Sequence, residues 1–103
     1  MGTKDFHDNT TLPTGWTLSD VRRRARDDVA LSLDPSTPVY LAPYGPDESA
    51  PLNVDIILDF SGLYLARCID DSEWYMGQRA APEEPILCWS SYGEDLGTAI
   101  DNL

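Results

Sequence analysis

Basic residues are scarce in this chain of 103 residues, which has seven Lys and Arg against eighteen Asp and Glu and a formal net charge of −11. Within residues 27–103, only Arg67 and Arg79 stand against fifteen acids. A field of this sign repels phosphate backbones and anionic lipid headgroups. The charge therefore argues against direct binding to nucleic acid or to membranes and favours a basic protein partner.

Histidine is nearly absent, because His7 is the only one and lies in a polar N-terminal stretch. A Cys–His or Ser–His mechanism needs a base within hydrogen-bond reach of its nucleophile. His7 would have to fold back onto Cys88, Ser90 or Ser91 to serve as that base. The stretch "WSSYG" (89–93) also lacks the glycine that precedes the serine of a nucleophile elbow. The sequence predicts a protein that is not an enzyme and has no catalytic residue.

Cysteine and long apolar runs are also lacking. Cys68 and Cys88 are too few for a disulfide framework, so we expect two buried thiols, with a disulfide between them or a reactive thiol as the alternatives. No apolar run approaches the roughly 20 residues needed to cross a bilayer, and the first 15 residues do not resemble a secretory signal. No phosphate loop, EF-hand or zinc spacing occurs. We therefore expect a cytoplasmic protein without metal or cofactor.

What the chain does contain is enough apolar surface for one core, with 42% hydrophobic and 10% aromatic residues. We expect a flexible N-terminal arm over residues 1–16 and a single α+β domain over residues 17–103. Thr17 and Asp20 have the spacing of a capping box, and Leu18, Val21, Ala25 and Val29 follow at helical spacing. A helix is therefore predicted from Thr17 until Asp34-Pro35, where the proline ends it.

Four to five short strands follow in the sequence. Residues 37–44 are rich in β-formers but bracketed by Pro38 and Pro43, which favours a short edge strand. Residues 54–60 and 63–69 are separated by Ser61-Gly62 and read as a hairpin. Residues 74–78 and 86–92 complete an antiparallel meander of four to five short strands.

The register of the hairpin has two alternatives. A two-residue turn places Leu63, Leu65, Arg67 and Ile69 beside the residues from Val54 to Phe60. A bulge shifts the pairing by one residue and moves Tyr64, Ala66 and Cys68 to that face instead. We favour the bulged register, because it brings Arg67 near Asp55 or Asp59 and keeps its charge off the core face.

The last ten residues predict a short amphipathic helix. Glu94 and Asp95 are expected in its first turn, where the helix dipole favours acids, and Leu96, Ile100 and Leu103 form its apolar stripe. The two helices can cover one face of the sheet. The other face is either open, or covered by the helices or the N-terminal arm.

Aromatic residues concentrate in the meander, and alternation directs some of them away from the core. If the second sheet face is open, it carries aromatics rimmed by acids, which is the composition of a protein interface. We therefore predict a partner-binding surface made by the acids of two turns and two aromatics: Asp70, Asp71, Glu73, Trp74, Glu83, Glu84 and Tyr92.

The layout of residues 54–103, with its acidic charge, meander and C-terminal helix, resembles the immunity proteins of bacterial toxin systems. The resemblance implies a non-catalytic protein that neutralises a basic partner, such as a nuclease toxin, in the cytoplasm of the producing cell. Two alternatives stay open. One is a phage-type nucleic-acid mimic that inhibits a defence protein. The other is a structural or assembly subunit that forms a homo-oligomer through its edge strand.

Overall fold

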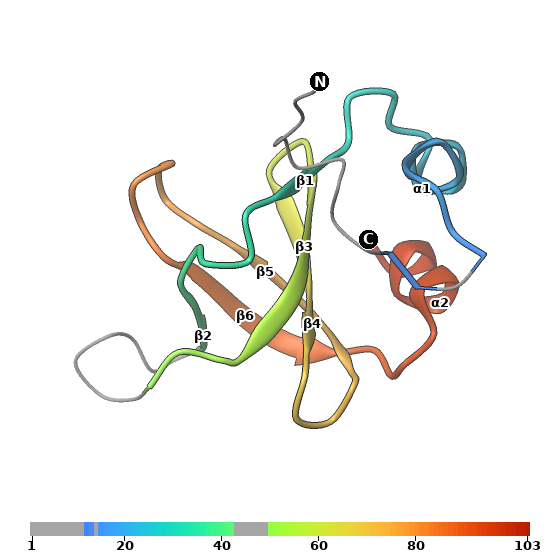
Figure 1. The fold of residues 1–103 in the computed structure, drawn as a ribbon. Helices are drawn as coiled ribbons and strands as arrows, with labels where there is room; N and C mark the ends of the chain where they lie inside the picture. The colour runs from blue at the N-terminus through green and yellow to red at the C-terminus, as the bar shows by residue number, and fades with distance from the viewer. Residues whose placement is uncertain (1–11, 14, 43–49) are drawn as a thin grey trace, which may run out of the picture.

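The structure is a computed structural model that describes residues 12–13, 15–42 and 50–103. Within these residues the chain forms, in order, α1 (Leu18–Ala25), β1 (Leu31–Leu33), β2 (Val39–Leu41), β3 (Val54–Phe60), β4 (Leu63–Cys68), β5 (Trp74–Gln78), β6 (Ile86–Ser91) and α2 (Leu96–Asp101). Both helices lie on the same side of one curled sheet (Figure 1). The α+β class is therefore as predicted.

The six strands are ordered β1-β3-β4-β5-β6-β2, so the sheet is not the simple meander that we expected. Strands β3 to β6 do form an antiparallel meander. The two short strands that precede it in sequence add to its opposite edges, β1 antiparallel to β3 and β2 parallel to β6. Placing β2 at an edge confirms the prediction made from its flanking prolines, because a proline cannot donate to a second neighbouring strand.

Helix α1 begins as predicted but is shorter. Thr17 and Asp20 form the capping box, with each side chain accepting a hydrogen bond from the other's backbone N–H. The helix ends at Arg26, which takes the left-handed conformation with φ 55°. The helix predicted to run on to Asp34 is therefore wrong: Leu31–Leu33 pair with β3, and Val29 is 68% exposed. Sheet pairing overrides the helical periodicity of this segment.

The hairpin of β3 and β4 has the two-residue turn, so the bulged register that we favoured is wrong. Phe60 pairs with Leu63, and Leu58 with Leu65. The bulge lies at the far end instead, at Asp55. This displacement lets the Asp55 carboxylate accept two hydrogen bonds from Arg67, from Nε at 3.1 Å and from Nη2 at 2.7 Å. The expected contact of Arg67 with Asp55 is thus present, although the register that predicted it is not.

Two apolar clusters lie on the two faces of the sheet. The helix-side cluster joins α1 and α2 to β3, β4 and β5, with Trp74, Leu58 and Leu96 among its buried members, and Leu12 and Trp16 pack against it. The second cluster holds Val39, Ile57, Tyr64, Ile86 and Cys88, among others, which come from four of the strands. The curl of the sheet closes this second face without help from the helices.

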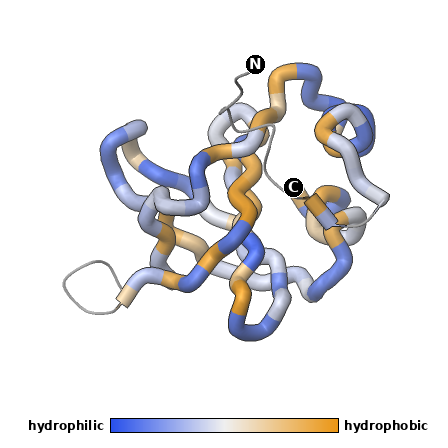
Figure 2. The backbone as a smooth tube through the Cα atoms, in the orientation of Figure 1, coloured by the Kyte–Doolittle hydropathy of each residue, from blue (hydrophilic) through white to orange (hydrophobic). Residues whose placement is uncertain are grey.

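Helix α2 is also shorter than predicted. Asp95 is its N-cap and accepts from the Thr98 N–H at 2.9 Å, so Glu94 and Asp95 precede the first turn. Leu96 and Ile100 are buried as expected, and Leu103 is partly exposed. Hydrophilic residues mark the β4–β5 and β5–β6 turns (Figure 2). Most of the predicted N-terminal arm, residues 1–11 and 14, lies outside the described residues.

Candidate partner-binding surface

The turn between β4 and β5, residues 70–73, is the first part of the predicted surface, and we refer to it as the acidic turn. Asp71 organises it, because its carboxylate accepts from the Tyr75 hydroxyl at 2.6 Å and from the Glu73 N–H at 3.0 Å. These hydrogen bonds, that of Tyr75 above all, lower the pKa of Asp71. The side chains of Asp70 and Glu73 make no hydrogen bond or ion pair with any described residue. Both charges are therefore available to a partner.

Tyr92 lies at the same end of the sheet as the acidic turn. The Tyr92 N–H donates to the Trp74 carbonyl, and the Trp74 N–H donates to the Gly93 carbonyl, both at 2.9 Å. The segment that leads into α2, with Glu94, thus runs beside the start of β5. Tyr92 is half-buried and packs against the helix-side cluster, so only part of its ring can reach a partner.

Glu83 and Glu84 lie at the other end of β5, in the β5–β6 loop. The five residues of β5 separate this loop from the acidic turn, a span of about 17 Å at the rise of a β-strand. Both glutamates are exposed, and neither side chain contacts a described residue through a hydrogen bond or ion pair. The predicted acids therefore form two separate sets rather than one surface.

Trp74 does not belong to any free surface, and its prediction as a contact residue is corrected. It is 0% exposed and lies in the helix-side cluster. Its pairing with Arg67 places it on the face that the helices cover, and the Arg67 guanidinium lies 5.9 Å from its ring centroid. The alternation of side chains along a strand places Trp74 and Tyr75 on opposite faces of the sheet. It does not tell which of the two residues lies on the helix side.

Trp89 is the exposed aromatic residue that the sequence analysis did not select, with 48% of its surface exposed. It sits at a β-bulge: Ser90 pairs with Met76 and Cys88 with Gly77, so Trp89 has no partner on β5. A Cβ at Gly77 would lie 2.5 Å from the Leu87 carbonyl oxygen and 2.8 Å from the Cys88 sulfur. Only glycine permits this approach, and Gly77 is the one signal in the sequence that points to the bulge.

A shallow groove surrounds Trp89 at the edge of the sheet that β6 and β2 form. We refer to it as the Trp89 groove. It is lined by residues of β5, of β6, of the β5–β6 loop and by the residue that follows β2: Ala42, Gln78, Arg79, Ala80, Glu84, Pro85, Leu87 and Trp89. It therefore joins the second set of acids to an apolar floor.

The positive charges of the described residues are largely used within the chain. Five of its six arginines donate to an internal partner: Arg22 to the Ala30 carbonyl, Arg23 to Asp20, Arg24 to Asp101, Arg67 to Asp55, and Arg79 to the Tyr64 hydroxyl and the Pro82 carbonyl. The Arg26 side chain alone makes no such contact with a described residue. The acids of both sets therefore keep their charges unneutralised.

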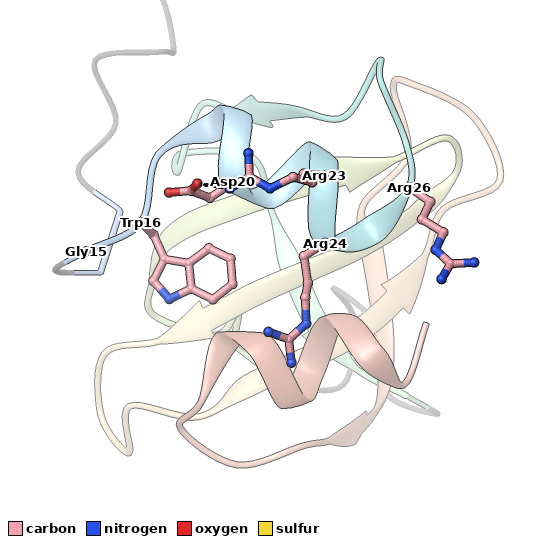
Figure 3. Close-up of a pocket in the computed structure, with 6 residues that line it drawn as sticks. All are labelled: Gly15, Trp16, Asp20, Arg23, Arg24 and Arg26. Atoms are coloured by element: carbon pink, nitrogen blue, oxygen red, sulfur yellow. Dashed lines mark hydrogen bonds and ion pairs between the residues drawn. The ribbon is translucent and has the colours of Figure 1, made fainter.

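A second hollow is lined by Arg23 and Arg24 of α1 and by Arg26 at its C-cap, together with Gly15, Trp16 and Asp20 (Figure 3). The close-up shows that their charges do not converge. Arg23 turns to Asp20, Arg24 points down onto α2, and Arg26 points away from Trp16. Because two of the three guanidiniums already have carboxylate partners, this hollow is not built to hold an anion.

The candidate nucleophile Cys88 is unsuited to attack a substrate. It is fully buried, and burial raises the pKa of its thiol to about 12, so the reactive thiolate is absent at neutral pH. Cys68 is also buried, and the two cysteines are free rather than paired. His7 lies outside the described residues. Within those that are described, no three His, Cys, Asp or Glu side chains form a group able to hold a metal ion.

No helix in the described residues has both the length and the apolar character that crossing a membrane requires. No protein-family model, curated protein or solved structure matches this chain. The resemblance to immunity proteins therefore stays a prediction from layout and charge.

Proposed function

We propose that this protein is a non-catalytic binding protein that neutralises a basic protein partner. Its proposed biological role is that of an immunity protein, which binds a toxin such as a nuclease in the bacterial cytoplasm. The observation that carries the proposal is the imbalance of free charge. Five of the six arginines in the described residues donate to partners inside the fold, whereas Asp70, Glu73, Glu83, Glu84 and Glu94 have no such partner among the described residues.

Free carboxylates on a rigid turn support rapid association with a basic partner. A net charge of −11 steers an oppositely charged protein toward the molecule, and fixed acids at the contact select its orientation. The acidic turn is held in place by Asp71 and Tyr75, so the charges of Asp70 and Glu73 are presented without the ordering cost of a mobile loop. Tyr92 offers a half-buried aromatic ring at the same end of the sheet.

A capture experiment tests the proposal. The purified protein, immobilised on a resin, is exposed to lysate of the producing organism at low salt and at roughly 0.5 M salt, where the screening length shortens to a few ångströms. We expect one basic protein to be retained, and to form a complex of defined stoichiometry with the purified bait. Asp70→Asn/Glu73→Gln should weaken this complex and lower its salt dependence.

Asp28→Asn is the matched control, because Asp28 is an exposed acid outside both sets and makes no hydrogen bond or ion pair with a described residue. It should leave the complex nearly unchanged. Absence of any basic partner at either salt, with a stable homo-oligomer on sizing, would overturn the proposal and favour the assembly subunit. Capture of a nucleic-acid-binding protein that added DNA displaces would instead favour the nucleic-acid mimic.

A further inference from the structure

The Trp89 groove is an apolar surface that the fold leaves uncovered. Gln78 lies on the helix side of β5, two residues after buried Met76, and pairs with Leu87. Helix α2 packs on β5 but does not extend over this corner of the sheet (Figure 1). Leu87 is consequently 37% exposed, next to Trp89. An exposed tryptophan beside an exposed leucine has the composition of an interface anchor.

The backbone holds Trp89 in this position. The bulge takes Trp89 out of the β5–β6 ladder, and the close approach of β6 to Gly77 fixes the bulge. Bulges of this kind redirect a side chain at an edge of a sheet. The indole is therefore presented by a rigid strand and not by a loop, which reduces the entropy lost when a partner binds.

The charge of the rim is negative. Arg79 lines the groove, but its guanidinium donates to the Tyr64 hydroxyl at 3.0 Å and to the Pro82 carbonyl at 3.0 Å, and lies over the Tyr64 ring. Glu84 also lines the groove and has no such partner among the described residues, and exposed Glu83 precedes it. An aromatic floor with free carboxylates at its rim complements a cationic group that carries apolar surface.

We propose that the Trp89 groove binds a segment of the basic partner in which an apolar side chain is flanked by lysine or arginine. The apolar side chain packs on Trp89 and Leu87, while the flanking cations meet Glu83 and Glu84. This inference rests on the proposed function and gives that function a second contact surface, about the length of β5 away from the acidic turn.

Synthetic peptides test the proposal without knowledge of the partner. Three peptides of equal length are compared at about 0.15 M salt: one alternates lysine with leucine, one replaces each leucine by serine, and one replaces each lysine by glutamine. The readout is the indole N–H resonance of Trp89, which a Trp89→Phe spectrum distinguishes from those of Trp16 and Trp74. We expect the lysine–leucine peptide to shift this resonance more strongly than the other two.

Substitutions then separate the groove from general charge. Trp89→Ala should weaken binding of the lysine–leucine peptide about tenfold or more. Glu83→Gln/Glu84→Gln should weaken it more than Asp70→Asn/Glu73→Gln, which removes the same charge at the acidic turn. Val29→Ala, at the most exposed large hydrophobic side chain of the described residues, should have no effect.

Four results would overturn the proposal. If the lysine–leucine peptide binds but neither shifts the Trp89 resonance nor responds to Trp89→Ala, the groove is not the site, and the preference for a basic partner stands. If the glutamine–leucine peptide binds equally well, the carboxylates of Glu83 and Glu84 do not favour a cationic ligand. If the Trp89 resonance shifts with protein concentration alone, the occupant is a second copy of the chain. Failure of every cationic peptide to bind would count against the proposed function as well.

Discussion

The Arg24 guanidinium on α1 donates two hydrogen bonds to the Asp101 carboxylate on α2, from Nε at 2.9 Å and from Nη2 at 2.7 Å. The same guanidinium packs over Gly97, where an added Cβ would lie 3.1 Å from Nη2. This contact joins a residue from the first quarter of the chain to one near its end. It fixes the two helices against each other on the same side of the sheet.

The Arg24–Asp101 contact predicts a pH dependence. Because the hydrogen bonds from Arg24 lower the pKa of Asp101 below its usual value of 3.8, the pair stabilises the fold above pH 3.8 and this contribution is lost as the pH falls further. Asp101→Asn should lower the melting temperature slightly at pH 7. The difference from the wild type should shrink below pH 3.8 and in high salt. Thermal unfolding measures both, with Asp28→Asn as the control, and an equal difference at all pH values would contradict the prediction.

Substitution of Arg67 should lower the free energy of unfolding more than substitution of an arginine without an ion pair. It makes two hydrogen bonds to Asp55, and its guanidinium lies near the ring of buried Trp74. Arg67→Ala should lower the free energy of unfolding by about 1 kcal/mol, since the pair remains partly exposed to solvent. Arg26→Ala, which removes a guanidinium without an ion pair to a described residue, should change it little. Urea denaturation compares them, and equal losses in the two variants would refute a specific role for Arg67.

Substitution by alanine should affect stability very differently at two glycines. At Gly77 the new Cβ would meet the Leu87 carbonyl oxygen and the Cys88 sulfur, and the backbone of β6 cannot move away without breaking the bulge. Gly77→Ala should therefore cost about 2 kcal/mol or more. At Gly97 the neighbour is the flexible end of Arg24, and alanine favours the helix, so Gly97→Ala should stay within about 1 kcal/mol of the wild type.

Urea titration of both glycine variants gives the comparison. The indole spectrum of Gly77→Ala should also show a displaced Trp89, whereas that of Gly97→Ala should not. A Gly77→Ala protein as stable as the wild type would mean that the bulge does not depend on this glycine.

The buried thiol of Cys88 should be protected from alkylation in the native protein. Because burial raises the pKa of Cys88 to about 12, the native protein should react with iodoacetamide at this position only after unfolding. The unfolded thiol ionises near its usual pKa of 9.0, so the neutral buried thiol stabilises the fold below pH 9 and this contribution is lost as the pH rises toward 12. Mass spectrometry of alkylated peptides, with and without urea, measures the protection. Rapid alkylation of Cys88 in the native protein would contradict it.

Local signals in the sequence predicted the parts of the fold that depend on neighbouring residues. Thr17 and Asp20 mark the start of α1, Ser61-Gly62 marks the hairpin turn, and the flanking prolines mark β2 as an edge strand. Contacts between distant residues decided the rest. The left-handed conformation of Arg26 ends α1 early, and pairing with β3 turns Leu31–Leu33 into a strand.

The candidate surface was predicted only in part for the same reason. Asp70, Asp71, Glu83 and Glu84 are exposed and Glu73 is half-buried, as a turn composition implies, but the separation of the two sets by the length of β5 is visible only in the folded sheet. Trp74 and Trp89 look alike in the sequence, since each stands in a strand next to alternating neighbours. The helices cover Trp74, whereas a bulge exposes Trp89. Both environments depend on residues that are distant in the sequence.

The parallel pairing of β2 with β6 sets an order on folding during synthesis. Val39 in β2 can pair only after Ile86 in β6 has been synthesised. Likewise, α1 can pack against α2 only after the end of the chain has been synthesised. The β3–β4 hairpin closes over only two residues and can form as soon as it leaves the ribosome, whereas pairing of β2 requires a long loop to close first. Strand β2, which is translated before the four strands of the meander, is therefore among the last strands to pair in the sheet, and a chain released before β6 would lack the strand that pairs with β2.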